Sequence, residues 1–316
     1  MGIRPFDWRD LPILMRTRKR GIYFDNASVL TRGERLVYLG AMLSYFAPAS
    51  GIYTYLHSDD EKNRETLLGG VTHNQDQHLA RLSFIAPASA VDGNTLVDLL
   101  EYIIQQIGSR GAFHLLAEVE DGTACFDDLR QAGFALYVYQ RIWKSPPETG
   151  DKPNPSRWRD ITGRDVIAVR SLYSTLVPAL VQQVESLPTE EMKGQVYYQD
   201  DEIKAYTEVR YGQQGIWMHP YVHPDTVEVT PLLADLLLNL PNRHSRPIYL
   251  CIRSYQSWLE NALEDLHASA GPTQAVMVKH LAVAQKVKSS FSLPAIEGGQ
   301  QEITTPFARS ERNNNL

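Results

Sequence analysis

Residues 216–240 read IWMHPYVHPDTVEVTPLLADLLLNL, and this stretch decides the fold. Apolar and polar side chains alternate at its start, which predicts a β-strand. After a short loop, Thr230 and Pro231 favour a helix start, because threonine is a good N-cap and proline is tolerated in the first turn. Leucines then recur at helical spacing up to Leu240. The stretch therefore predicts a strand, a loop and a helix whose unpaired N–H groups face the loop and suit a phosphate.

The same pattern occurs earlier in the chain. Residues 78–86 predict a strand, residues 87–94 a loop and residues 95–107 a helix. Each of the two copies is followed by a strand, a helix and another strand. One supersecondary unit that occurs twice, about half a chain apart, predicts two similar domains.

The composition predicts an ordinary globular protein. The chain has 316 residues, of which 43% are hydrophobic and 22% charged, enough for two cores. Its net charge of −6 and isoelectric point of about 5.9 argue against nucleic acid as a partner. Cys125 and Cys251 give no disulfide or metal framework and fit a reducing compartment. No apolar run reaches the length of a signal peptide or a membrane span, so we expect a cytoplasmic protein without membrane contact.

Residues 145–156 read SPPETGDKPNPS and are the clearest linker in the chain. We therefore predict an N-terminal domain over residues 1–144, this linker, a C-terminal domain over residues 157–288, and a polar, mobile tail over residues 289–316.

Three positions predict local irregularities. The paired glycines Gly69 and Gly70 lie inside a predicted strand and indicate a bulge or a close backbone approach. Pro220 interrupts the strand of the opening stretch, where proline is found mainly at bulges, and we favour a bulge there. Pro178 predicts a break in the helical pattern of residues 166–184.

The order of the elements resembles that of the GNAT N-acetyltransferase fold. Residues 222–225 (VHPD) resemble the V-x-P-E/D at which the family's fourth strand ends, and residues 85–87 resemble the same end in the first half. Gly133 and Phe134 resemble the GF that precedes the family's sixth strand. The resemblance covers residues 3–144 and 157–284. It implies a tandem GNAT protein of the α/β (α+β) class, in which each half has a mixed, mostly antiparallel central sheet flanked by helices.

The resemblance also implies a coenzyme, acetyl-CoA or another acyl-CoA, whose arm enters between splayed central strands and whose pyrophosphate lies at a helix N-terminus. The residues at these places are Ile85, Ala86, Gly93, Asn94, Thr95, Val222, Thr226, Val227, Val229 and Thr230. The second loop departs from the family, because it lacks glycine and carries Glu228. The first loop has Gly93 but no arginine, and we expect it to be the better pyrophosphate site. A tyrosine that serves the family as general acid is replaced by Leu129.

Amide formation needs a base that takes a proton from the amine. Glu208, His219 and His223 lie on neighbouring predicted strands and are our catalytic candidates. In the alternative interpretation, Glu208 pairs with Arg210 or solvent and the histidines are packing residues. Glu118, His73 and Arg81 hold comparable places in the first half. His219 and His223 have no third ligand nearby, so we predict no metal site.

Two functions follow from these patterns. The first is an acyl-CoA-dependent N-acyltransferase that transfers acetyl to an amine, with one half binding the coenzyme and the other mainly structural. The second is a catalytically inactive tandem GNAT fold that serves as a binding or scaffold module. The acceptor, a small molecule or a peptide amine, and the oligomeric state cannot be read from the sequence.

Overall fold

The computed structural model describes residues 2–17, 20–58, 65–74, 77–91, 93–146, 155–187 and 192–281. Residues 1–283 form one compact unit. Most of the predicted linker and the whole of the predicted tail lie outside the described residues, so their outlines stay predictions.

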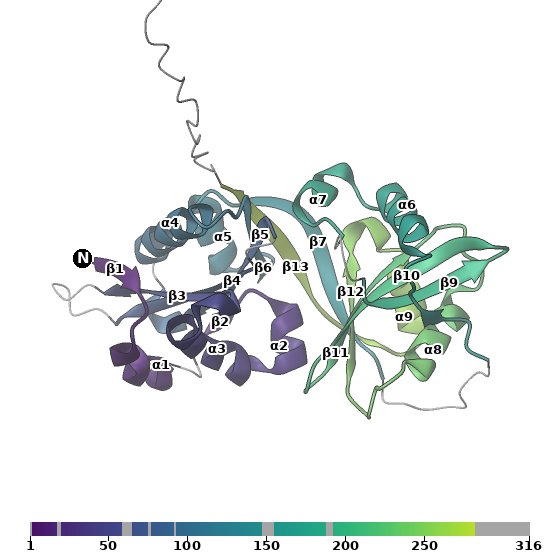
Figure 1. The fold of residues 1–316 in the computed structure, drawn as a ribbon, viewed down its shortest axis with the longest axis horizontal. Coiled ribbons are helices and arrows are strands. Elements are labelled where there is room, and N and C mark those ends of the chain that lie inside the picture. The colour runs from purple at the N-terminus through teal and green to yellow at the C-terminus, as the bar shows by residue number, and fades with distance from the viewer. Residues whose placement is uncertain are drawn as a thin grey trace, which may run out of the picture. The chain divides into compact units, whose positions relative to one another are not determined.

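The first half builds one end of a mixed sheet (Figure 1). Its strands, in the order in which they pair, are β1 (Gly2–Pro5), β3 (Ile52–Ser58), β4 (Leu67–His73), β5 (Leu79–Ala86) and β6 (His114–Glu120). Two short elements, β2 (Ile22–Tyr23) and α2 (Asn26–Arg32), connect helix α1 (Leu11–Thr17) to α3 (Glu34–Phe46). Helices α4 (Gly93–Gly108) and α5 (Ala124–Gln131) pack on the opposite face of the sheet from α1 and α3.

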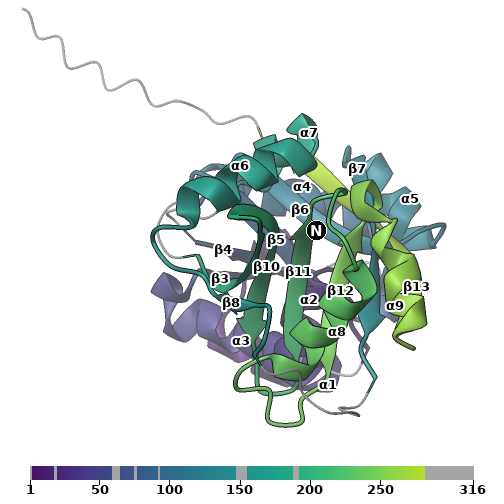
Figure 2. The ribbon, with the colours of Figure 1, turned by 90° about the vertical axis from the view of Figure 1, so that its right-hand side faces the viewer.

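The second half repeats this plan at the other end of the sheet (Figure 2). Its strands are β8 (Arg159–Asp160), β9 (Gly194–Gln199), β10 (Glu202–Tyr211), β11 (Ile216–Val222) and β12 (Ile248–Arg253). Its helices are α6 (Val166–Leu176), α7 (Ala179–Val184), α8 (Val229–Asn239) and α9 (Leu259–Asp265), with a short helical turn over Ser254–Gln256. The break between α6 and α7 falls at Pro178, as predicted.

Helix α8 buries the leucines whose helical spacing predicted this helix. Leu232, Leu233 and Leu236 are fully buried against β10, β11 and β12. The helix begins at Val229, after Glu228 in the left-handed conformation, so its N-cap lies two residues before the predicted one at Thr230. The loop before the helix covers residues 223–228, one residue earlier in the chain than the strand pattern predicts and of the same length.

The last strands of the two halves are exchanged. Strand β7 (Ala135–Lys144) follows α5 in the chain but pairs with β12 of the second half. Strand β13 (Ser269–His280) follows α9 but pairs with β6 of the first half, and β7 and β13 also pair with each other. One sheet therefore runs through both halves in the order β1-β3-β4-β5-β6-β13-β7-β12-β11-β10-β9-β8.

Each half contains one pair of parallel strands that separates toward its carboxyl end. Strands β5 and β6 pair in parallel over Leu79–Arg81 and His114–Leu116. Strands β11 and β12 do so over Ile216–Met218 and Ile248–Leu250. Beyond these residues neither pair keeps its ladder, which leaves one opening in the sheet in each half.

Pro220 lies in a regular stretch of β11, opposite Thr207 of β10 and without a register shift, so the predicted bulge is wrong. The N–H of His223 donates to the carbonyl of Lys204 at 2.8 Å, which fixes the alternation of hydrogen-bonded pairs along the ladder. By this alternation the Thr207–Pro220 pair is not hydrogen-bonded, and the nitrogen of Pro220 faces β12. Because β11 and β12 have separated there, no ladder hydrogen bond is lost through the missing N–H of Pro220.

The irregularity predicted at the paired glycines is confirmed. The register of β4 and β5 shifts beside Gly70, where Ser83 is the extra residue of β5. A Cβ atom on Gly70 would collide with the ring of Phe84. The glycine therefore allows Phe84 to cross β4 closely.

Candidate functional site

A segment of the chain itself occupies the opening in the first half. Strand β2 pairs with the end of β5, with Ile22 opposite Ile85. The N–H of Phe24 donates to the carbonyl of Ser83 at 3.1 Å, and its carbonyl accepts from the N–H of Glu118 at 2.9 Å. Phe24 thus bridges β5 and β6 as a strand would, and its side chain is fully buried in the core.

The same segment reaches the loop that the sequence predicted for pyrophosphate. The N–H of Ala88 donates to the carbonyl of Arg20 at 2.6 Å. Ile85 and Ala86 are fully buried beside this segment. Both predicted coenzyme contacts in this strand therefore face protein in the structure.

Gly93, Asn94 and Thr95 form the first turn of α4. Asn94 is exposed, whereas Thr95 is buried. The space beside Gly93 is lined by the side chains of Asp128 and Gln131. An acidic group near this turn weakens its attraction for a phosphate.

The opening in the second half contains a side chain instead of a strand. Val222 follows Pro220 in the alternation along β11, so its carbonyl also faces the gap toward β12. The side-chain amide of Gln256 donates to this carbonyl at 3.0 Å. Gln256 and Val222 are both buried. One amide therefore satisfies the carbonyl that the separation of the strands exposes.

The loop after β11 divides its side chains between protein and solvent. Thr226 is buried, and its hydroxyl donates to the carbonyl of Lys204 at 3.4 Å. The hydroxyl of Thr230 donates to Asp265 at 3.3 Å, and Val229 packs against the core under α8. Val227 points outward and is 59% exposed.

Glu228 places an acidic side chain at the start of α8. Its carboxylate lies 3.2 Å from Arg157, and both side chains are largely exposed. A negative charge at a helix N-terminus itself interacts with the helix dipole. A phosphate at this loop would have to bind beside that carboxylate and its arginine.

Glu208 and His219 are direct cross-strand neighbours on β10 and β11. Residues in such a pair project from the same face of the sheet, so the structure brings these two predicted catalytic side chains together. The carboxylate of Glu208 accepts from the Nε of Arg210 at 2.8 Å. The Nδ1 of His219 lies 3.2 Å from the hydroxyl of Tyr221.

His223 lies apart from this pair, just beyond the end of β11. Its Nδ1 accepts from the N–H of Asp225 at 3.2 Å, within the loop. The carboxylate of Asp225 is 3.7 Å from the same nitrogen. The ring is thus part of the loop structure rather than of the Glu208–His219 pair.

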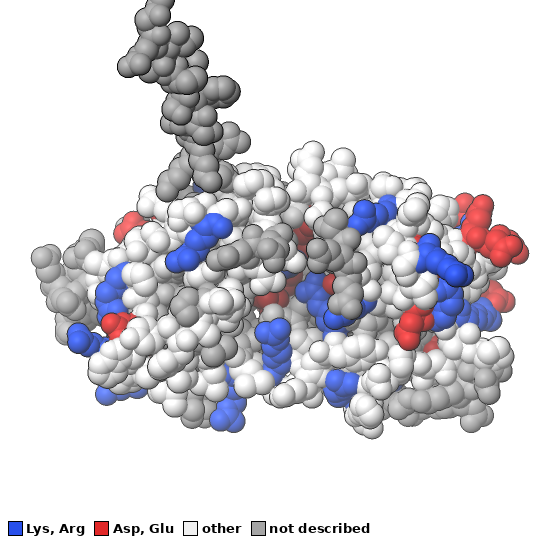
Figure 3. All heavy atoms as spheres, in the orientation of Figure 1, with Lys and Arg blue, Asp and Glu red and all other residues white. Residues whose placement is uncertain are grey.

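A cluster of polar side chains lies beside His219, on the face of the sheet where the two halves meet. We call it the central cluster, and its members are Asn26, Arg81, Glu118, Tyr137, Gln140, Glu185, His219, Arg253 and Gln274. Figure 3 shows acidic and basic side chains gathered near the middle of one face of the molecule.

Glu185 is the centre of this cluster and follows α7 directly in the chain. Its carboxylate accepts from the Nη2 of Arg253 at 2.8 Å and from the Nη2 of Arg81 at 3.0 Å. The hydroxyl of Tyr137 also donates to it. The carboxylate therefore joins β5 of the first half to β12 of the second.

Glu118 extends the cluster toward the first opening. Its carboxylate lies 3.6 Å from Arg81 and accepts from the side chain of Asn26 at 2.8 Å. Asn26 begins α2, directly after the segment that occupies the first opening. The cluster thus connects the contents of the first opening with the strands around the second.

The charges of the cluster determine its protonation. Burial alone would raise the pKa of Glu185, but Arg253 and Arg81 lower it to about 2. Burial lowers the pKa of His219 to about 3, and Arg253 adds to this effect. Burial raises the pKa of Tyr137 well above its usual value, and Glu185 reinforces the shift. At neutral pH the cluster therefore holds an ionised Glu185 beside a neutral His219 and a neutral Tyr137.

Six members of the central cluster escaped the sequence analysis, among them Arg253 and Glu185, which form its central ion pair. Arg253 ends an apolar strand, IYLCIR, and a charge that closes such a run is a usable signal. Glu185 follows a short helix and carries no signal of its own. Of the first-half candidates, Arg81 and Glu118 belong to the cluster, whereas His73 bonds to the carbonyl of Gln77 elsewhere.

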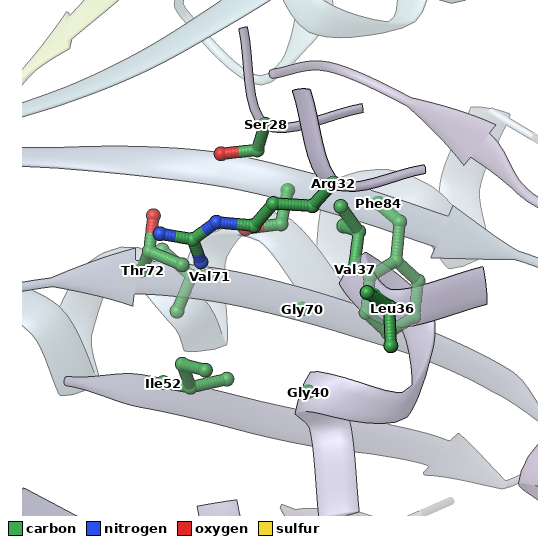
Figure 4. A pocket seen from close by; sticks show the side chains of 11 residues that line it. Ser28, Arg32, Leu36, Val37, Gly40, Ile52, Gly70, Val71, Thr72 and Phe84 are labelled. Atoms are coloured by element: carbon green, nitrogen blue, oxygen red, sulfur yellow. The ribbon is translucent and has the colours of Figure 1, made fainter. Parts of the chain in front are cut away.

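A pocket of about 40 Å³ lies elsewhere in the first half, between α2, α3 and strands β3 to β5 (Figure 4). Arg32 extends across it toward Thr72, and Ser28 lies at its edge. Its volume suits about one or two water molecules, so it is too small for an acyl-CoA arm. It contains none of the predicted site residues.

Two features are absent from the described part of the chain. No three histidine, cysteine, aspartate or glutamate side chains in that part of the chain are grouped to hold a metal ion. No helix in it is both long enough and apolar enough to cross a membrane.

Comparison with solved structures establishes the fold class. A GCN5-related N-acetyltransferase from Sphaerobacter thermophilus has a TM-score of 0.52 at 11% identity, over 88% of this chain and 95% of its own. A tandem GNAT protein from the clavulanic acid biosynthesis pathway has a TM-score of 0.51 at 10% identity, over 90% of this chain and 99% of its own. The chain therefore has the tandem GNAT fold, which confirms the resemblance seen in the sequence. No family model and no curated protein sequence matches the chain.

Proposed function

We propose that the protein is an acyl-CoA-dependent N-acyltransferase that works through its second half. The observation that carries this proposal is the difference between the two openings. A backbone strand occupies the first, whereas the side chain of Gln256 occupies the second. A side chain can rotate away from a ligand at low cost, but displacing a paired strand breaks several hydrogen bonds at once. We therefore place a single acyl-CoA between β11 and β12.

In this proposal the coenzyme takes the place of the Gln256 amide. The arm of coenzyme A contains amide groups, one of which would donate to the carbonyl of Val222. The pyrophosphate would lie near Thr226, Val227 and Thr230, at the start of α8. Acetyl-CoA is the simplest donor that fits this arrangement.

The acceptor amine would approach over the face that carries Glu208 and His219. Its nitrogen attacks the acyl carbonyl, the bond from carbon to sulfur breaks, and coenzyme A leaves. Glu208 is the better base of the pair, because a His219 with a pKa of about 3 holds a proton poorly. The buried Nε2 of His219 would instead bond to the amine or to a water that carries its proton.

The coenzyme site is tested by replacing Gln256. A Gln256→Ala variant should bind acetyl-CoA about three- to tenfold more tightly in calorimetry, since the coenzyme no longer competes with one internal hydrogen bond. Gln195→Ala, which changes another buried glutamine in β9, serves as the matched control. Acetyl-CoA that binds neither wild type nor Gln256→Ala would refute the proposed site.

The base is tested by Glu208→Gln in an assay of acetyl transfer to a panel of amines. Turnover should fall by about 10²–10⁴-fold while acetyl-CoA affinity stays nearly constant. Glu202→Gln, on the exposed end of the same strand, should leave turnover unchanged. Equal turnover in the two variants would exclude Glu208 as the base.

The second candidate function is a binding module without catalysis. Glu228 at the pyrophosphate loop and the occupied first opening favour it. Tight acetyl-CoA binding without transfer to any amine would support this alternative.

A further inference from the structure

Three nitrogen atoms beside Glu185 are buried without a hydrogen-bond partner among the described residues. They are the Nε and Nη1 of Arg253 and the Nε2 of His219. Arg253 is only 4% exposed, and a single nitrogen, Nη2, makes both of its bonds to Glu185. A guanidinium offers five donors in a planar fork, so most of this buried fork lacks an acceptor.

Buried donors without acceptors are uncommon, and each one calls for an acceptor group that the described residues do not supply. The charges around His219 indicate the sign of that group. Arg253, Arg210 and Arg81 all act on its imidazole, and Glu185 is the carboxylate that opposes them. Arg210 is already paired with Glu208, and Arg81 with Glu118 and Glu185. The donors that lack an acceptor belong mainly to the guanidinium of Arg253, which suits an anionic acceptor.

We propose that Arg253, Arg81 and His219 form a subsite for the carboxylate of a small ligand, at the junction of the two halves. Arg253 would bind the carboxylate through its free nitrogens, and the Nε2 of His219 would donate to the carboxylate or to the amine that the ligand carries beside it. If the protein is the acyltransferase proposed above, its acceptor is then an amine that also carries a carboxylate, such as an amino acid or the end of a peptide.

Glu185 occupies part of this subsite in the structure. It already places a carboxylate between Arg81 and Arg253, one from each half. A ligand carboxylate would share these arginines with Glu185 or displace it. Glu185 directly follows α7, so its displacement would also release the end of that helix from β5 and β12.

The experiment uses a carboxylate without an amine, so that binding does not depend on acyl transfer. Succinate is titrated into the full-length protein by calorimetry, and succinamide, which has the same shape without charge, is the ligand control. Wild type should bind succinate and not succinamide. Arg253→Gln should weaken succinate binding by about tenfold or more, because a charge-assisted pair is lost.

Glu185→Gln should change the affinity in the opposite direction. It keeps the size of the side chain but removes the competing charge, so succinate should bind several-fold more tightly. A purely structural cluster would lose stability in both variants and gain affinity in neither. Arg159→Gln, which breaks the pair between the half-exposed Arg159 and the buried Asp165, should leave succinate binding unchanged.

Several outcomes would overturn the proposal. They are the absence of succinate binding to wild type and to Glu185→Gln, equal binding of succinate and succinamide, and equal affinities in Arg253→Gln and wild type. Failure of acetyl transfer together with the expected succinate pattern would refute the proposed function and leave the carboxylate subsite in place. Acetyl transfer to amines without succinate binding would refute the carboxylate subsite and leave the proposed function in place.

Discussion

His219 and Glu185 respond to acid in the same direction, although one is a base and the other an acid. The pKa of His219 falls from its ordinary 6.5 to about 3 in the folded protein. Between these two pKa values the unfolded chain binds a proton at His219 and the folded chain does not. The free energy of unfolding therefore decreases as the pH drops below about 6.5. The pKa of Glu185 falls from 4.5 to about 2, so its stabilisation is lost only at lower pH.

We therefore predict that the free energy of unfolding decreases between about pH 7 and about pH 5.5, by at most about 1.4 kcal/mol per pH unit from His219. His219→Asn should remove this part of the pH dependence. Urea unfolding at the two pH values measures it, and His244→Asn, at an exposed loop position, is the control. An unchanged pH dependence in His219→Asn would show that the pKa of the imidazole is the same in the folded protein as in the unfolded chain.

The residues of the candidate site differ in how far the sequence predicts them. Glu208 and His219 were predictable because both lie on strands whose alternation sends them to one face. Arg253 and Glu185 were not, because their contact depends on the packing of α7 over β12, which no local pattern encodes. The cluster arises from tertiary packing between segments that are far apart in the chain.

The element that most changes the interpretation of the first half is β2. It is too short to show an alternating pattern, and neither it nor α2 was predictable from the sequence. The regular elements around it were predictable, because β5 and α4 each show a clear period over many residues. What fills the opening in the first half is thus a segment that shows no periodicity in the sequence.

Because the segment formed by β2 and Phe24 bridges β5 and β6, we predict that each chain binds at most one acyl-CoA, in the second half. Val229→Arg, at the start of α8, should change acetyl-CoA affinity, whereas Gly93→Val, at the start of α4, should not. Calorimetry gives the stoichiometry and both affinities. Two coenzyme molecules for each chain would place one of them in the first half. An effect confined to Gly93→Val would place the site in the first half instead of the second.

The same segment should be essential to folding. Phe24 is fully buried, so Phe24→Ala should lower the free energy of unfolding by about 3–5 kcal/mol through the lost burial and the cavity that remains. Thermal or urea unfolding measures this loss. Trp8→Ala, at a side chain that is 52% exposed, should cost far less and is the control. A small effect of Phe24→Ala would mean that the segment leaves the opening easily. The first half would then again be a candidate coenzyme site.

At the scale of the whole molecule, the exchange of β7 and β13 makes the two halves dependent on each other. The order of elements in each half was predictable, but the partner of each last strand was not. Strand β7 has the same pattern whether it pairs within its own half or with β12, since alternation specifies a face and not a neighbour. The predicted boundary at residues 145–156 therefore divides the chain without separating the sheet.

This exchange predicts the behaviour of a chain cut within the linker. If a protease site is inserted between residues 147 and 154 and cleaved, the two fragments should remain together in size-exclusion chromatography. Strand β13 stays between β6 and β7, and the core under α6 and α7 contains Leu116 from the first half and Val276 from the second. Separation would expose both residues and break three strand pairings, β6 with β13, β13 with β7 and β7 with β12. Each fragment expressed alone should lack a cooperative unfolding transition, and mixing the two should restore it. Fragments that separate on cleavage and unfold cooperatively alone would show instead that the halves are independent domains.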